Sequence, residues 1–115
     1  KAALAGKCGA SLTVSLRAPF PEKAGDMELC TILSNALDNA ICACRELEGR
    51  REITVKSVSR GKMWLLSVEN DFSGDTPFRP GTGIANIRRA AADCGGTAEI
   101  FVRVERFFVN ILIGY

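Results

Sequence analysis

Apolar residues alternate with polar ones near both ends of the chain and recur every three to four positions in between. Over 11–17, positions 12, 14 and 16 are apolar and share one side, which predicts a half-buried strand. The helical period starts after Asp26, a candidate N-cap, and runs to about Leu47, where Gly49 is suited to end the helix. Its apolar stripe consists of Leu29, Leu33, Ala36, Ala40, Ala43 and Leu47.

The second half of the chain alternates in four further places and contains one more helical stretch. Strands are expected over 53–59 and 63–71, and a closing hairpin over 98–104 and 107–113. A loop rich in Gly, Pro and Asp is expected over 73–82, and a helix over 84–94 that Gly95 and Gly96 end.

The order of these elements predicts the fold class. Strand, helix, two strands, loop, helix and two strands indicate an α+β fold, a two-layer sandwich with helices packed on one face of a mixed five-stranded sheet. The 115 residues suit a single domain over 1–115. Residues 1–9 are expected to be the tail of an upstream linker helix.

Composition excludes several classes of function. A net charge of +2 is too small to indicate nucleic acid or an anionic membrane as a partner. The absence of His removes most catalytic triads, most zinc sites and any phosphorylatable His within these residues. Five cysteines, an odd number, indicate reduced thiols rather than a disulfide framework. No apolar run approaches the roughly 20 residues of a membrane-spanning helix.

Two asparagines, Asn35 and Asn39, lie four residues apart on the long predicted helix. This spacing places both side chains on one face, about one turn apart. Asn is a mediocre helix former, so two on one face favour a function, and neutral amide oxygens suit a magnesium ion that keeps several water ligands. A polar outer surface of the helix explains the same pair without a ligand.

Two further features join this pair. Asn70 shares one side of its strand with Leu66 and Val68, so its amide is expected to face the helices, where it needs either a ligand or a local turn as partner. Gly81-Thr82-Gly83 precedes the second helix, whose N-terminal N–H groups and partial positive charge suit a phosphate. Taken singly, this glycine loop is equally a flexible helix cap.

The ordered set of motifs resembles the ATP-binding fold shared by gyrase, Hsp90, MutL and histidine kinases. The matching segments are Asn35 to Ala40, which resembles the N box, and Val68 to Asn70 and Gly81 to Arg88, which resemble glycine boxes flanking a lid over the nucleotide. The resemblance covers about Ser11 to Gly114. Leu29 to Ile41 is most similar to peptide-sensing histidine kinases of the accessory-gene-regulator and VirS type, which also carry Asn at the position of Asn70.

The resemblance implies ATP and Mg²⁺ as cofactors. Asn39 would coordinate the Mg²⁺ that bridges the phosphates, Asn35 would contact the phosphates and support the metal, and Asn70 would accept a hydrogen bond from the adenine amino group. The glycine boxes would wrap the phosphates. The residues expected to bind the nucleotide are Asn35, Asn39, Asn70, Gly74, Gly81, Thr82, Gly83 and Ile84.

The implied function is that of the ATP-binding domain of a two-component sensor histidine kinase. Such a domain presents Mg-ATP for phosphoryl transfer to a His in a separate dimerisation domain of the same protein. It has no catalytic residue beyond those that position ATP, and alone it is not expected to autophosphorylate. A response regulator is the expected indirect partner. The expected location is cytoplasmic, within a membrane-anchored receptor but without direct membrane contact.

Several residues depart from the family pattern and keep alternatives open. Phe72 replaces the first Gly of its glycine box, the lid between Gly74 and Gly81 is short, and Cys42 stands where many kinases have a phosphate-binding Lys or Arg. These departures favour, as an alternative, a nucleotide-sensing or protein-interaction module of the same fold without catalysis. An anti-sigma serine kinase is less favoured still, because Thr31 is neutral in the part of the N-box helix where those kinases carry an acidic base.

Overall fold

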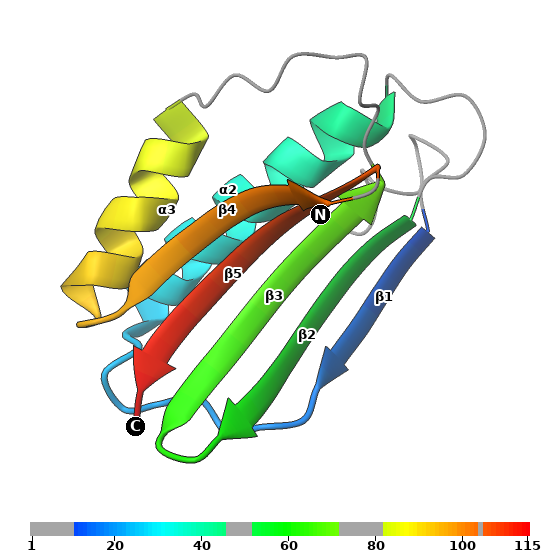
Figure 1. Ribbon diagram of the computed structural model, residues 1–115. Coiled ribbons are helices and arrows are strands. Elements are labelled where there is room, and N and C mark those ends of the chain that lie inside the picture. Colours follow the sequence, from blue (N-terminus) through cyan, green and yellow to red (C-terminus); the bar gives the residue numbers. More distant parts are fainter. Residues whose placement is uncertain (1–10, 46–51, 72–81, 104) are drawn as a thin grey trace.

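A computed structural model describes residues 11–45, 52–71, 82–103 and 105–115, and within them two helices cover one face of a five-stranded sheet (Figure 1). The elements in chain order are β1 (Ser11–Leu16), α2 (Asp26–Arg45), β2 (Glu52–Arg60), β3 (Met63–Asp71), α3 (Thr82–Asp93), β4 (Thr97–Arg103) and β5 (Arg106–Gly114). The expected upstream helix tail over 1–9, and Gly49, lie outside the described residues.

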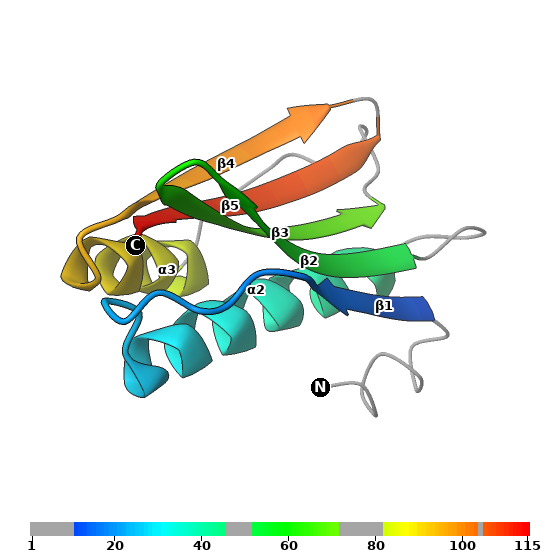
Figure 2. The same cartoon turned by 90° about the horizontal axis from the view of Figure 1, so that it is seen from below.

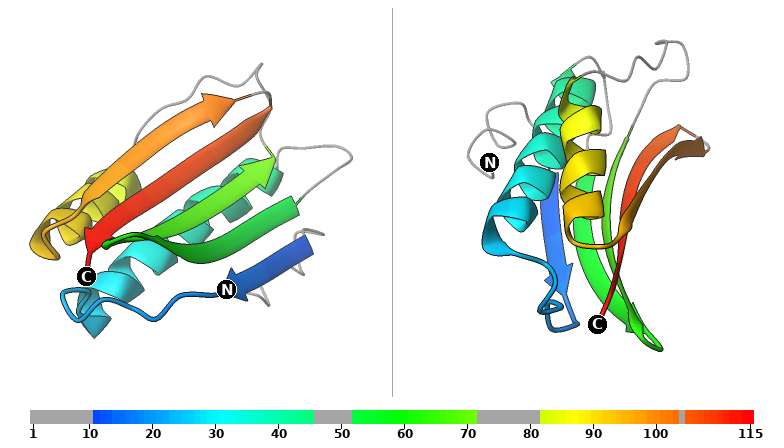
Figure 3. Two further views of the ribbon diagram at one scale, coloured as in Figure 1. Left: turned by 60° about the horizontal axis from the view of Figure 1, so that its bottom comes forward. Right: turned by 90° about the vertical axis from the view of Figure 1, so that its left-hand side faces the viewer.

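The sheet is mixed, with strand order β1-β2-β3-β5-β4. β1 pairs with β2 in parallel, and the other neighbours are antiparallel. Both helices lie on the same side of the sheet (Figures 2 and 3), which confirms the predicted two-layer α+β sandwich. Within the described ranges, no helix is both long and apolar enough to cross a membrane.

The core lies between the helices and the inner face of the sheet. Alternate residues of β3 and β5 point inward, and the apolar stripes of the helices meet them, as the periodicity predicts. Burial of one large aliphatic side chain contributes about 1.5–3 kcal/mol. The fully buried side chains include Ile32, Ile53, Trp64, Leu66, Val68, Ile87, Phe107, Val109, Ile111 and Ile113.

The helix ends follow the local sequence closely. The first helical residue of α2 is Asp26, and the carbonyl oxygen of Gly25 accepts the bond from the Leu29 N–H at 2.9 Å, so Gly25 rather than Asp26 is the N-cap. At the end of α3 the Gly96 N–H donates to the Ala91 carbonyl at 2.8 Å, and Gly95 has a φ of 73°. A left-handed glycine with such a bond closes a Schellman-type cap.

β1 departs from the prediction of a half-buried strand. Its inner side chains do face α2, but Val14 and Leu16 are 56% and 51% exposed, and only Leu12 packs against the core. The reason is lateral position. β1 is the last strand on its side of the described sheet, while α2 packs mainly on β3 and β2 (Figure 1).

Candidate functional site

Asn35 lies on the side of α2 that contacts α3. Its amide nitrogen donates to the Thr31 carbonyl at 2.7 Å within the same helix. Its Oδ1 faces Gly83 of α3, so closely that a Cβ at that glycine would lie 3.3 Å from this oxygen. Asn35 therefore has a structural bond on one side and directs its acceptor oxygen toward the first turn of α3.

Asn39 lies one turn further along α2 and is partly exposed. The next residue, Ala40, is fully buried and packs with Ile41 against Ile53 of β2. Ile53 in turn pairs with Asn70 across the sheet. Asn39 is thus next in the chain to a contact between α2 and β2. That contact lies at the end of the sheet where β3 carries Asn70.

Asn70 is 1% exposed and points to the helix side of the sheet, as its alternation with Leu66 and Val68 predicts. Its Nδ2 donates to the Asp71 carbonyl oxygen at 2.8 Å. This bond occupies a donor of the amide and leaves Oδ1 as the group suited to a further partner. An acceptor in that place is complementary to an amino group rather than to a carbonyl.

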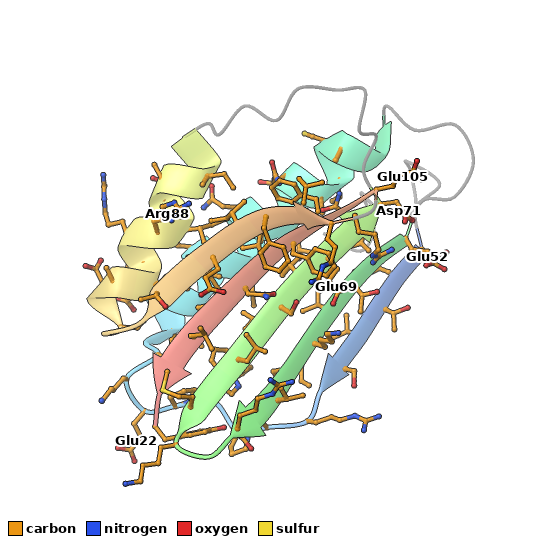
Figure 4. The ribbon with its side chains drawn as sticks, in the orientation of Figure 1. Glu22, Glu52, Glu69, Asp71, Arg88 and Glu105 are labelled. Carbon is orange, nitrogen blue, oxygen red and sulfur yellow. The ribbon has the colours of Figure 1, made fainter. Side chains whose placement is uncertain are left out.

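Asp71 fixes the end of β3 through a set of contacts that has no local signal in the sequence. Its Oδ1 accepts a bond from Arg106 at 2.9 Å, and its Oδ2 accepts one from the Glu52 N–H at 2.8 Å. Figure 4 shows Asp71 and Glu69 toward the same end of the sheet. Because Asn70 bonds to the backbone of Asp71, this anchoring also positions the Asn70 amide.

Ionic contacts continue across the outer face of the sheet from this anchor. Glu69 lies 2.8 Å from Lys56 and 3.5 Å from Arg106, so two strands flanking β3 are both tied to it. The partners become neighbours only through the β2–β3 and β3–β5 pairings. A pattern of residues along the chain cannot reveal such pairs before the strand order is known.

The start of α3 supplies the second half of the site. Thr82 is its first residue, and no acidic side chain lies in its first turn, so the partial positive charge of its free N–H groups is not neutralised there. Ile84 is 4% exposed and belongs to the core, so only its backbone remains for a ligand. Gly74, Gly81 and the side chain of Thr82 lie outside the description.

A cavity of about 270 Å³ lies between the two helices but does not include Asn39 or Asn70. It adjoins the site through Thr31, whose carbonyl holds Asn35. Its walls carry charges of both signs, and Asn35, Asn39 and Asn70 are not among the lining residues. These three asparagines, rather than the cavity, therefore mark the candidate site. The lining residues are Met27, Glu28, Thr31, Asn86, Arg89, Ala90 and Asp93.

Among these residues the structure brings Asn35 against Gly83 at the start of α3, while Asn39 lies one turn further along α2 and Asn70 at the end of β3. Asn35 and Asn39 offer neutral oxygens of the kind Mg²⁺ accepts alongside water, the α3 N-terminus offers N–H donors to phosphate, and Asn70 offers a buried acceptor. Cys42, close to Asn39 along α2, is exposed and neutral. The set can position and polarise a ligand, but among these side chains none is a general acid or base.

The sequence pattern that defines the GHKL domain matches residues 26–114. No curated protein matches the chain. Solved structures do. The Acinetobacter baumannii histidine kinase AdeS superposes with a TM-score of 0.78 at 17% identity, over 97% of this chain and 57% of that one. The catalytic domain of histidine kinase ThkA superposes with a TM-score of 0.74 at 18% identity, over 96% and 82%.

A third match is full-length ShkA in complex with AMPPNP, with a TM-score of 0.72 and 19% identity over 99% of this chain and 28% of that one. At these identities the matches establish the fold alone. The present chain spans little more than half of AdeS. The superpositions show that these residues have the fold of histidine kinase catalytic domains.

Proposed function

This chain belongs to the GHKL domain family, and from that membership we propose that it is the ATP-binding domain of a two-component sensor histidine kinase. The observation that carries the proposal is the meeting of Asn35 with Gly83 where α2 and α3 touch. This contact joins the helix that resembles the N box to the segment that resembles a glycine box, although nearly half of the chain separates them, and it therefore supports the proposal.

The proposed cofactors are ATP and Mg²⁺. When bound, the metal neutralises phosphate charge, and the chemistry is in-line transfer of the γ-phosphoryl group. Asn39 is proposed to hold the metal, with Asn35 as support. The backbone of Gly81, Thr82, Gly83 and Ile84 is proposed to hold the phosphates, with Gly74 on the other side of the nucleotide.

Asn70 is proposed to recognise the adenine amino group. The bond from its Nδ2 to the Asp71 carbonyl supports this role, because it occupies a donor of the amide and leaves Oδ1 as the acceptor. A neutral hydrogen bond contributes about 0.5–1.5 kcal/mol and one to a charged group about 1.5–3. We therefore expect binding about fivefold to tenfold weaker than with the Asp usual in the family, a difference of roughly 1 kcal/mol.

The phosphoryl acceptor is proposed to be a His in a separate dimerisation domain of the same protein, since the chain itself has none. A response regulator would then receive the group. Similarity of the N box to the peptide-sensing accessory-gene-regulator and VirS type favours a membrane-anchored receptor with this domain on the cytoplasmic side.

A second candidate is a nucleotide-sensing module without catalysis. The exposed, neutral Cys42 favours it, because no cation lies at the position where many kinases neutralise phosphate.

Calorimetric titration of the chain with ATP and with GTP, each with and without Mg²⁺, tests nucleotide binding. We expect Mg²⁺-dependent ATP binding in a range of about tens of micromolar to millimolar, and a matching rise in melting temperature. Absence of binding at millimolar nucleotide would rule out a kinase and a nucleotide-sensing module and would leave a protein-interaction module of the same fold. A longer piece of the natural protein that binds Mg-ATP but transfers no phosphoryl group to itself would favour the second.

A further inference from the structure

β1 presents an open edge that, unlike most of the surface, contains no charged residue. Its sequence, Ser-Leu-Thr-Val-Ser-Leu, consists of β-favouring and small polar residues. Among the described residues no strand pairs with its outer side (Figure 1). Proteins commonly protect such edges with charges, proline or a bulge, because an unpaired edge is a template for another strand.

An apolar groove runs along the inner side of this edge. It has a volume of about 180 Å³, and β1 forms one wall and α2 the other. Leu12, Val14, Leu16 and Phe20 line it from the first side, and Leu33 and Leu37 from the second. Val14, Leu16 and Phe20 are each at least half exposed, so this wall of the groove is incomplete in the single chain.

The hydrogen bonds between β1 and β2 determine which residues of β1 direct their backbone N–H and C=O groups toward the open edge. The Arg17 N–H donates to the Ser57 carbonyl of β2 at 3.2 Å. In a strand, alternate residues direct their N–H and C=O groups to opposite edges. The odd-numbered residues therefore bond to β2, and Leu12, Val14 and Leu16 direct their backbone groups outward.

We propose that β1 pairs with β1 of a second copy of this chain, antiparallel and centred on Val14. In this register Val14 lies opposite Val14 of the partner subunit, and Leu12 lies opposite Leu16 of the partner subunit. The three outward-facing residues thereby form pairs of the kind that exchange two backbone bonds. The same register places every inner apolar side chain against another apolar one and joins the two sheets into one.

Charge and area are consistent with this partner. Arg17, the nearest charge at the end of β1, lies opposite Ser11 of the partner subunit rather than another cation. The other edge strand, β4, carries Glu99 and Arg103, charges of the kind that protect an open edge. A strand of this length spans only about 17–20 Å, so the interface is small and the dimer belongs to the weak class below roughly 1,200 Å².

Sedimentation velocity up to several hundred micromolar tests the assembly. We expect a concentration-dependent dimer for the wild-type chain, and for Val14→Lys a dissociation constant at least about tenfold higher, because two cations would face each other on the two-fold axis. Thr13→Lys is the matched control. Thr13 is also exposed on β1 but faces the other side of the sheet, so the dimer is expected to persist.

Crosslinking tests the register and does not depend on the stability of the lysine variants. A pair that exchanges backbone bonds has Cα atoms about 5.5 Å apart, within disulfide range, so Val14→Cys should form a disulfide between the two copies, identified by mass spectrometry of the linked peptides. Thr13→Cys should not, since the two introduced thiols lie on residues about 8 Å apart. A monomer at every concentration, or crosslinking of Thr13→Cys in place of Val14→Cys, would overturn the proposal.

Discussion

The side of α2 that faces α3 and the side that faces β1, its two flanks, differ in the kind of partner that each could still bind. Toward α3 the helix presents Asn35, whose amide oxygen faces Gly83 in the first turn of that helix, and Asn39 follows one turn further along α2. Toward β1 it presents Leu33 and Leu37 to an apolar groove whose far wall is half exposed. One flank suits a small anionic ligand and the other suits a protein surface, although a single helix builds both.

The contrast between the flanks shows that burial alone does not locate a site. The polar flank is recognisable from the sequence, because two asparagines on one helical face conflict with helix propensity. The apolar flank looks like ordinary core in the sequence. It becomes distinct only when the strand order places β1 beyond the main contact of α2.

The largest expected effect concerns the floor of the groove. Trp64 is fully buried and meets the ring of Phe20 edge-on, with 5.4 Å between centroids. Trp64→Ala should lower the free energy of unfolding by about 3–5 kcal/mol, measured by urea denaturation. Phe20→Ala is the matched change on the half-exposed wall and should cost about 1 kcal/mol. Equal losses would mean that the groove has no exposed wall.

The next effect concerns Asn70, for which the family resemblance makes a prediction about ATP affinity and the structure makes one about stability. Resemblance alone predicts that Asn70→Asp strengthens ATP binding. The structure predicts a loss of about 1–3 kcal/mol in stability, because the variant lacks the donor to the Asp71 carbonyl and places a second oxygen against it. Denaturation of the variant beside Asn39→Asp, a partly exposed control, measures this. An unchanged stability together with tighter ATP binding would favour the resemblance.

Asn39→Ala separates ligand binding from folding. Since Asn39 is partly exposed and Ala is the best helix former, stability should stay within about 0.5 kcal/mol. Loss of a metal ligand should weaken ATP binding about tenfold in Mg²⁺, equivalent to roughly 1.4 kcal/mol. Titrations without Mg²⁺ are the control, because there the variant and the wild type should agree. A large loss of stability would instead make Asn39 a structural residue.

Much of the fold could be predicted from the sequence because its signals are local. The period of α2, the alternation of β2, β3 and β5, and the Gly95-Gly96 stop each depend on neighbouring residues, and each is confirmed to within a few residues. The N-cap is displaced by one residue from its predicted place, since the bond to the Gly25 carbonyl depends on backbone geometry rather than on the Asp26 side chain.

The remainder depends on long-range pairing. The exposure of Val14, the anchoring of Asp71 by Arg106, and the bond that orients Asn70 all require the strand order or the backbone path at the end of β3. Within the candidate site, alternation along β3 predicts that Asn70 points to the helix side of the sheet. It does not predict which atom of the Asn70 amide has a hydrogen-bond partner. The roles assigned to Gly74 and Gly81 stay predictions.

The smallest expected effect tests the contact between α2 and α3 with a single methyl group. Gly83→Ala should change the stability of the chain by no more than about 0.5 kcal/mol, because the helix propensity gained with Ala, at a glycine without a positive φ, is offset by the close contact of the new Cβ with Asn35. The new Cβ would lie 3.3 Å from Asn35 Oδ1, an oxygen whose amide is held by Thr31, so ATP affinity should fall about threefold, equivalent to roughly 0.65 kcal/mol. Affinity should thus fall while stability stays nearly unchanged. A double-mutant cycle with Asn35→Ala isolates the cause. In that background the methyl group meets no oxygen, so Gly83→Ala should become stabilising and lose its effect on affinity. A threefold loss that persists without Asn35 would place the obstruction elsewhere in the site.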